Sequence, residues 1–316
     1  MEKVLVITGP TASGKSKLSL ELAEYYPIEI ISADSMQVYR YMDIGTDKPP
    51  IEERQRIPHH LVDIKYPDEP WSVEEFQVLA RKAISEIRER GNVPCVVGGT
   101  GFYIRALLEN YPLYDAPPDW ETRKELQRLA QMRGNEAVHA MLRDIDPESW
   151  QTLHPNDLKR VIRAIEYYRA TGRPISERKH RKLPAPYNAL MIGLRWRRQE
   201  LYERIDNRVE DQFQRGFVEE TKRLLEMGYS EDLPSMQGLG YKEICQYLKG
   251  LTTLAETKAL IKRNTRRFAK RQFTWFSREG GIIWVEMSKD KSWNSAVEEV
   301  RRLYEGWISE NLPMTE

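Results

Sequence analysis

The feature that most constrains this chain is a glycine-rich segment near its N-terminus. Residues 9–16 read Gly-Pro-Thr-Ala-Ser-Gly-Lys-Ser and match the pattern G-x-x-x-x-G-K-[ST]. An apolar run at residues 4–8 precedes the segment, and an amphipathic stretch at residues 15–25 follows it. This order predicts a strand, a phosphate-binding loop and a helix, because the glycines let successive N–H groups face one anion and the helix N-terminus adds partial positive charge.

Each position of the loop is a candidate ligand of a polyphosphate. Lys15 supplies a point charge, and the hydroxyl of Ser16 is a candidate ligand of Mg²⁺. Taken alone, the loop favours a nucleotide kinase or NTPase, but it binds phosphate oxygens and does not distinguish the groups attached to them. The candidate phosphate-binding residues are Gly9, Pro10, Thr11, Ala12, Ser13, Gly14, Lys15 and Ser16.

The remaining apolar pattern predicts an α/β protein with a parallel sheet. Further strands are expected at residues 28–32, 60–64, 93–97, 188–194 and 282–287. Helices are expected at residues 73–90, 120–143, 158–171 (with Gly172 as its stop), 254–278 and 292–308, and between residue 198 and breaks at Gly228 and Gly238 to Gly240. We therefore expect a P-loop NTPase-like core built from residues 1–114 and 187–316, with an inserted all-helical domain at residues 115–186 and a helical C-terminal region.

Composition narrows the class of protein further. The 316 residues are 40% hydrophobic and 31% charged, which is typical of a globular protein and not of a disordered one. No apolar run approaches the roughly 20 residues of a spanning helix, no leader precedes the first expected strand, and Cys95 and Cys245 fit neither a disulfide framework nor a metal site. We expect a soluble cytoplasmic protein. The net charge of +1 does not exclude nucleic acid, because local clustering of charge decides such binding.

Polar residues follow two of the expected strands where α/β sheets bind ligands. Asp34 follows the strand at residues 28–32, where it is either a general base or Mg²⁺-associated carboxylate, or the N-cap of a short helix at residues 36–39. Thr100 lies among Gly98, Gly99 and Gly101, which indicates either a close backbone approach to a ligand or an ordinary tight turn. The adjacent His59 and His60 favour a structural role over a metal site, because neighbours on a strand point to opposite faces.

A basic segment at residues 262–278 carries seven cations and no acidic residue. On a helix its cations form two ridges, which flank apolar residues from Phe268 to Trp275. This pattern favours contact with nucleic acid over a solvated helix face that is docked through its aromatic residues. A smaller basic set at Lys159, Arg160 and Arg163 lies in the expected helical insertion, where an ordinary exposed face is the alternative.

Seven segments, taken in order, resemble the tRNA dimethylallyltransferase family, also called tRNA isopentenyltransferases. The resemblance covers most of the chain and is specific because all seven occur in sequence. The segments are residues 9–16 (GPTASGKS), 32–39 (SADSMQVY), 42–49 (MDIGTDKP), 98–103 (GGTGFY), 163–166 (RAIE), 238–241 (GLGY) and 268–275 (FAKRQFTW).

The resemblance implies an enzyme that transfers a dimethylallyl group from dimethylallyl diphosphate, with Mg²⁺, to N6 of the adenosine 3′-adjacent to the anticodon of tRNA. It implies that Asp34 accepts the proton of the adenine amino group and that Thr100 helps to hold the donor diphosphate or the bound base. Lys15 is expected to neutralise the departing diphosphate. It further implies contacts with the anticodon stem-loop from Asp34, Ser35, Met36, Gln37, Thr100, Arg123, Lys159, Arg160, Arg163, Gln237, Gly240, Tyr241, Lys242, Lys270, Arg271, Gln272, Thr274 and Trp275. The expected protein is a monomer without a membrane partner.

Three other functions remain open at this point. A small-molecule P-loop kinase would turn over ATP and would leave the basic segment without a role. An isopentenyltransferase acting on free adenine nucleotide would not need the helical insertion. An RNA-binding protein with a vestigial loop is the third, although Gly14, Lys15 and Ser16 are intact.

Overall fold

The computed structural model describes residues 1–110, 119–180 and 184–310. The chain divides into two compact units, one formed by Met1–Leu108 with Pro186–Glu316 and the other by Glu109–Ala185. The expected boundary between residues 114 and 115, and most of the proline-rich break around it, lie outside the described residues. The expected boundary between residues 186 and 187 lies one residue from the edge of the first unit.

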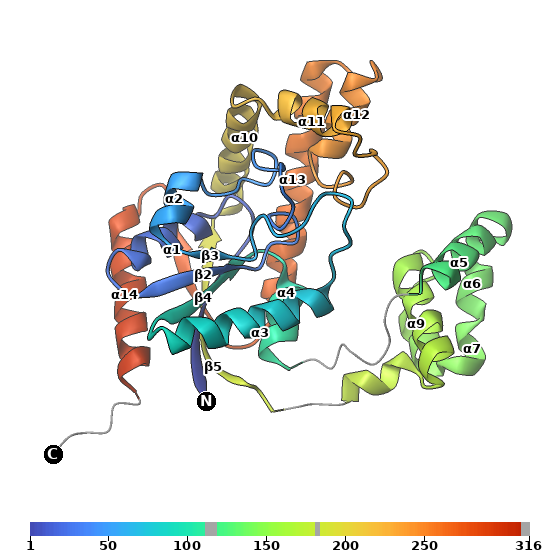
Figure 1. Cartoon of the computed structure of the whole chain (residues 1–316), viewed down its shortest axis with the longest axis horizontal. Helices are drawn as coiled ribbons and strands as arrows, with labels where there is room; N and C mark the ends of the chain where they lie inside the picture. Colours follow the sequence, from blue (N-terminus) through green and yellow to red (C-terminus); the bar gives the residue numbers. More distant parts are fainter. Residues whose placement is uncertain (111–118, 181–183, 311–316) are drawn as a thin grey trace. The chain divides into compact units, whose positions relative to one another are not determined.

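The first unit is built on a parallel sheet (Figure 1). Its described strands form one six-stranded sheet in the order β3-β2-β4-β1-β5-β6, and each neighbouring pair is parallel. The register joins Thr8 at the end of β1 to Gly98 on one side and Gly193 on the other. The strands are β1 (Glu2–Thr8), β2 (Ile28–Ser32), β3 (His59–His60), β4 (Val93–Gly98), β5 (Tyr187–Trp196) and β6 (Ile282–Met287). The sheet confirms the predicted fold class.

Helices cover both faces of this sheet, so its strands are apolar on both sides. Leu18 and Leu22 of α1 (Lys15–Ala23) and Val300 of α14 (Trp293–Ser309) pack in one core cluster. Phe76 of α3 (Val73–Glu89) and Leu107 of α4 (Gly101–Leu108) pack in a second. The short α2 (Ile51–Arg56) precedes β3. These two layers hold the carboxyl ends of the central strands in place.

A third core lies under the helices that follow β5 and extend beyond the sheet in Figure 1. Val38 and Met42, from the segment after β2, pack there against Phe217, Tyr241 and Ile261. The helices are α10 (Arg198–Gln214), α11 (Phe217–Glu226), α12 (Tyr241–Leu248) and α13 (Leu254–Phe276). This core fixes α10 and α13 beside the segment that follows β2.

The second unit is helical throughout its described residues. Its core gathers Leu126, Val138, Leu142 and Ile165. Its helices are α5 (Trp120–Arg133), α6 (Asn135–Ala140), α7 (Leu142–Ile145), α8 (Pro147–Thr152) and α9 (Leu158–Thr171), followed by the 3₁₀ helix η1 (Ile175–His180). Across the described parts of both units, the helices are all too short or too polar to traverse a bilayer.

Two predicted elements differ from the structure. The strand expected at residues 60–64 ends at His60, because Leu61 and Asp63 adopt left-handed backbone angles with φ of 62° and 57°. The helix expected at residues 120–143 is interrupted at Gly134, whose φ is 84°. The helix expected at residues 158–171 is confirmed, with Gly172 in the left-handed conformation at its C-terminus.

Candidate functional site

The phosphate-binding loop connects β1 to α1. Gly9 and Gly14 have φ angles of 138° and 98°, which residues with a side chain rarely adopt. A Cβ atom on Gly9 would also lie 2.8 Å from the carbonyl oxygen of Leu194 in β5. Glycine is therefore required at both ends of the turn. The N-terminus of α1 at Gly14 has no side-chain cap, so no N-cap side chain occupies the first N–H groups of this helix.

Lys15 lies over the mouth of this loop. Its Nζ donates a hydrogen bond to the carbonyl oxygen of Pro10 at 2.8 Å. Burial is the main cause that lowers the pKa of Lys15 to about 8, and the nearby charge of Arg208 lowers it further, while Asp34 and Asp47 oppose the shift. A buried cation in this position stabilises an anion that binds between it and the loop.

Two arginines of α10 reach the loop from its other side, and the sequence reasoning missed both. Arg208 Nη1 donates to Thr11 Oγ1 at 2.8 Å, and Arg204 Nε donates to the carbonyl oxygen of Ala12 at 2.8 Å. The guanidinium of Arg204 also stacks on the Trp196 ring, 4.3 Å from its centroid. The available signal was their four-residue spacing, which places them on one face of a helix that follows a central strand.

Asp34 and Thr100 meet at the ends of β2 and β4. Asp34 Oδ1 accepts a hydrogen bond from Met36 N at 2.8 Å, and Thr100 Oγ1 accepts one from Ser35 N at 3.2 Å. No helix forms at residues 36–39, so the alternative interpretation of Asp34 as an N-cap is wrong, and its carboxylate closes a local turn. The close approach signalled by the glycines is to the chain itself, because a Cβ on Gly98 would overlap the backbone of Ala33.

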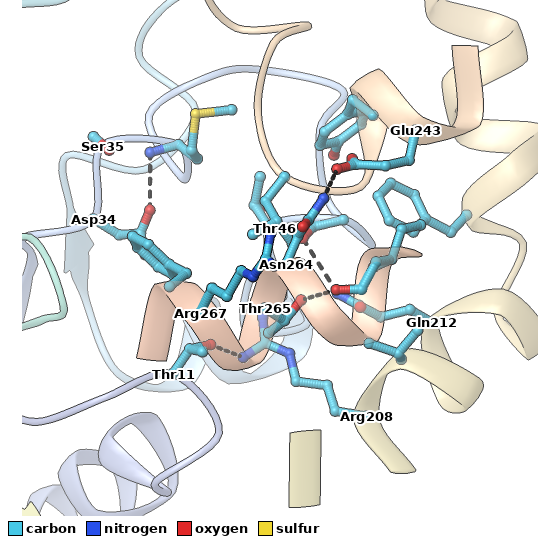
Figure 2. Close-up of a pocket in the computed structure, with 18 of the residues that line it drawn as sticks. Thr11, Asp34, Ser35, Thr46, Arg208, Gln212, Glu243, Asn264, Thr265 and Arg267 are labelled. Atoms are coloured by element: carbon cyan, nitrogen blue, oxygen red, sulfur yellow. Dashed lines mark hydrogen bonds between the residues drawn. The ribbon is translucent and has the colours of Figure 1, made fainter. Parts of the chain in front are cut away.

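Several cavities open around these groups. One of about 490 Å³ is lined by Gly14, Lys15, Ser16, Arg204 and Arg208, and two others share lining residues with each other. The larger has a volume of about 500 Å³ and is lined by Asp34, Thr100, the 45–46 segment, and residues of α10 to α13. Figure 2 shows Asp34, Thr11, Arg208 and Arg267 around it, with Arg208 bonded to Thr11. The smaller, of about 80 Å³, lies at Lys15 and Ser16. The lining residues common to both are Thr11, Asp34, Thr46, Arg208 and Phe268.

The two histidines do not form a metal site. His60 Nε2 lies 2.8 Å from Glu29 Oε2, and His59 Nδ1 lies 2.7 Å from the carbonyl oxygen of Ile57. His59 also lines the smaller cavity, and burial lowers its pKa. Among the described residues, no cluster of three His, Cys, Asp or Glu side chains is arranged to hold a metal.

The basic helix α13 divides its cations between two surroundings. Lys262 pairs with Glu210 at 2.7 Å and Arg266 pairs with Asp206, so this ridge is neutralised by α10. Arg267, Lys270 and Arg271 instead line a groove of about 620 Å³. The Arg105 guanidinium, which pairs with Glu279, stacks there 4.6 Å from the Trp275 ring centroid. The groove is lined by Arg105, Arg267, Lys270, Arg271, Thr274, Trp275 and Arg278. A surface of one charge sign with an aromatic ring suits a nucleic-acid strand.

Several residues expected to contact nucleic acid have partners inside the chain. Tyr241 is 1% exposed and donates its hydroxyl to Glu220 Oε1 at 2.7 Å. Gly240 begins α12, and its N–H donates to the Glu243 side chain. Gln37 and Gln237 donate their amides to backbone carbonyls at 3.3–3.4 Å and 2.7 Å.

The same is true in the second unit. Arg123 and Arg163 both pair with the buried carboxylate of Glu166, at 2.8 and 2.6 Å. Lys159 and Arg160 are exposed on α9 of this unit, and Lys242 is exposed on α12 of the first unit. The direct contacts expected of these residues stay predictions.

The parallel sheet carries a phosphate loop between β1 and α1, with cations from α1 and α10 around the loop and a carboxylate after β2. These features define a P-loop α/β protein that binds a phosphorylated ligand. The IPP transferase family model matches residues 37–279, and the isopentenyl transferase model matches residues 2–63. The chain belongs to the tRNA dimethylallyltransferase family, as its seven segments predicted, and it is a prenyltransferase enzyme.

Relatives of known name support this assignment. The tRNA dimethylallyltransferase 2 of Geotalea uraniireducens is 53% identical over 287 residues, which cover 90% of this chain and 92% of the relative. The tRNA dimethylallyltransferase of Acetivibrio thermocellus is 50% identical over a stretch of the same length and coverage.

Solved structures agree in fold. The full-length tRNA isopentenylpyrophosphate transferase from Bacillus halodurans is 43% identical, with a TM-score of 0.74 and 98% of both chains covered. A eukaryotic dimethylallyltransferase, solved in structures that show it acting on tRNA, is 29% identical with a TM-score of 0.86, covering all of this chain and 81% of that one.

Proposed function

We propose that this enzyme transfers the dimethylallyl group of dimethylallyl diphosphate to N6 of the adenosine 3′-adjacent to the anticodon in tRNA and releases diphosphate. The observation that carries the proposal is the pair of cavities that share Asp34 and Arg208. The smaller cavity is lined by Thr11, Lys15 and Ser16 of the phosphate loop. The larger cavity has the volume for a nucleobase. The names of the relatives support the donor and the acceptor.

In the proposed reaction N6 attacks the allylic carbon of the donor as the bond from that carbon to the diphosphate oxygen breaks. The exocyclic amine loses a proton to Asp34, which lies at the wall common to both cavities. The departing diphosphate is stabilised by Lys15, by Arg208 and by the N–H groups at the start of α1. Thr100 keeps Ser35 and hence the Asp34 turn in place.

The residues of the smaller cavity fit Mg²⁺. Ser16 and Asp47 offer a hydroxyl and a carboxylate, and Mg²⁺ commonly takes one or two carboxylates together with substrate phosphates and water. Ser16 is the proposed direct ligand. The cation, when bound, supplies further positive charge to the diphosphate as it departs.

The acceptor adenosine lies in an RNA loop, so its base must leave the stack to reach Asp34. We propose that the groove along α13 binds the RNA backbone and offsets this cost. Lys270, Arg271, Thr274 and Trp275 are the proposed contacts there, and Lys159 and Arg160 are proposed contacts in the helical unit. The monomeric state stays a prediction.

Transfer of radiolabel from dimethylallyl diphosphate to unmodified tRNA with Mg²⁺ tests this function, beside a parallel assay of ATP hydrolysis. We expect label in the tRNA, none in free AMP as acceptor, and no ATP hydrolysis. ATP turnover with unlabelled tRNA would instead show a kinase.

A further inference from the structure

Gln272 of α13 joins two parts of the site that are distant in sequence. Its side-chain Oε1 accepts a hydrogen bond from the N–H of Thr11 at 2.8 Å, and its Nε2 donates to the carbonyl oxygen of Gly99 at 2.9 Å. The residue is 7% exposed, and a Cβ atom on Gly99 would overlap its amide nitrogen. Both ends of the amide are therefore held by hydrogen bonds, and a side chain on residue 99 would displace it.

This contact uses one of the N–H groups of the phosphate loop. Such loops hold phosphates through consecutive backbone N–H groups, and a lysine reaches the outer phosphates. Oε1 of Gln272 already accepts the hydrogen bond from the backbone N–H of Thr11, so a phosphate oxygen could bind to this N–H only by displacing the side chain. The partial negative charge on Oε1 also repels an approaching phosphate oxygen.

The same end of the loop is covered by one cation of α10 and one of α1. Arg208 donates to the Thr11 hydroxyl at 2.8 Å, and Lys15 donates to the Pro10 carbonyl at 2.8 Å. At the opposite end a cavity of about 490 Å³ is lined by Gly14, Lys15 and Ser16. The loop is thus open at the start of α1 and closed at Pro10 and Thr11.

We propose that Gln272 is a specificity-determining residue, which makes this phosphate loop accept a diphosphate and reject the additional phosphate of a triphosphate. The inference rests on the proposed function in taking the donor to be a diphosphate ester. It explains how a loop whose pattern is typical of ATP-binding proteins serves a donor with two phosphates. Gln272 was expected from the family resemblance to contact tRNA, and its buried amide gives it this other role.

Charge alone predicts the opposite preference. Tripolyphosphate carries more negative charge than diphosphate, so nonspecific attraction to Lys15, Arg204 and Arg208 would favour it. A preference for diphosphate must therefore come from the shape of the loop and the occupied N–H group.

Titration calorimetry of inorganic diphosphate and inorganic tripolyphosphate with Mg²⁺ tests the inference. The variants are Gln272→Ala, which opens the space, and Gln272→Met, which keeps the length and packing but makes no hydrogen bonds to Thr11 or Gly99. The control is Gln131→Ala, an exposed glutamine of the helical unit. Thermal unfolding of each variant reports on folding.

We expect the wild type and the control to bind diphosphate at least about tenfold more tightly than tripolyphosphate. In Gln272→Ala this ratio should fall about fivefold or more, since one hydrogen-bonding group of the loop is freed. Gln272→Met should lower the ratio less, because it still fills the space.

Two results would overturn the inference. One is a wild type that binds tripolyphosphate as tightly as diphosphate, which decides the matter even if a variant fails to fold. The other is a change in both affinities by the same factor in the two variants. Failure of the proposed function is a separate result, because it would appear as absent transfer from dimethylallyl diphosphate to tRNA by the wild type.

Discussion

At the scale of single residues, the site depends on side chains that make a structural contact and also line a cavity. Asp34 is the clearest case. One of its oxygens accepts the Met36 N–H and fixes the turn, while the carboxylate lines both cavities. The residue thus has a structural contact and a proposed chemical role at once, and the two are separable by substitution.

Asp34→Asn is expected to slow dimethylallyl transfer by about 10²- to 10⁴-fold, because the amide cannot accept the proton. Its side-chain oxygen still accepts the Met36 N–H, so the turn should persist. Single-turnover rates together with calorimetry of donor binding check this. Near-normal turnover in Asp34→Asn would rule out Asp34 as the base, and lost donor binding would point to a structural fault.

Lys15 gives a pH dependence. Its pKa is lowered to about 8, mainly by burial, so the side chain loses its charge as the pH rises through about 8. Affinity for diphosphate should therefore be full below pH 8 and weaken above it, by up to about tenfold per pH unit. In Lys15→Arg the charge persists, so binding should be flat between pH 7.5 and 9. A wild type whose affinity is equally flat would contradict the prediction.

At the scale of elements, α13 has a side that packs inside the protein and a side that lines a groove at the surface. Its buried side includes Ile261, Ala269, Gln272 and Phe276, which pack into the cores and reach the phosphate loop. Its exposed side contributes cations to the groove. The period of the helix separates these two sides, since residues three or four apart share a face.

Combined alanine substitution of Lys270 and Arg271 should weaken tRNA binding and make it less sensitive to salt. Each lost phosphate contact is expected to reduce the slope of log K against log [salt] by about 0.7 to 0.9. Filter binding over a series of salt concentrations measures the slope. The charge-matched control replaces Lys82 and Arg88 of α3, and equal slopes for the two double variants would mean that the groove binds no RNA.

At the scale of the whole molecule, the sheet is held by buried charges as well as by apolar cores. Glu29 of β2 accepts hydrogen bonds from Arg90 at 2.7 and 2.8 Å and from Asn92 at 2.8 Å. The hydrogen bond with Arg90 is the largest cause that lowers its pKa to about 2. Its carboxylate therefore ties the start of β2 to the end of α3.

Because the folded-state pKa of Glu29 is depressed, its stabilisation is complete above the ordinary carboxyl pKa of 4.5 and is lost as the pH falls towards 2. Glu29→Gln should lower the free energy of unfolding at pH 7 by on the order of 2–3 kcal/mol. The difference from wild type should shrink below pH 4.5. Urea unfolding at pH 7, 4 and 3 measures it, and a difference independent of pH would contradict this account.

The sequence by itself determined what depends on neighbours along the chain. Gly9, Gly14 and Lys15 define the phosphate loop, and the helix at residues 158–171 ends at Gly172 as its periodicity predicted. Asp34 and Thr100 were predicted as site residues because they follow strands whose carboxyl ends lie at one edge of the sheet, and the structure places both at the wall of one cavity. These signals need no knowledge of distant residues.

Tertiary structure alone decided which distant side chains meet. Gln272 bonds to Thr11 across 261 residues, and Arg208 does so across 197. Local pattern marks such residues only as members of a helix, because periodicity gives a face but not what that face packs against. That packing also buries Lys15 and so lowers its pKa. It decides which cations of α13 pair with acidic residues of α10 and which line the groove.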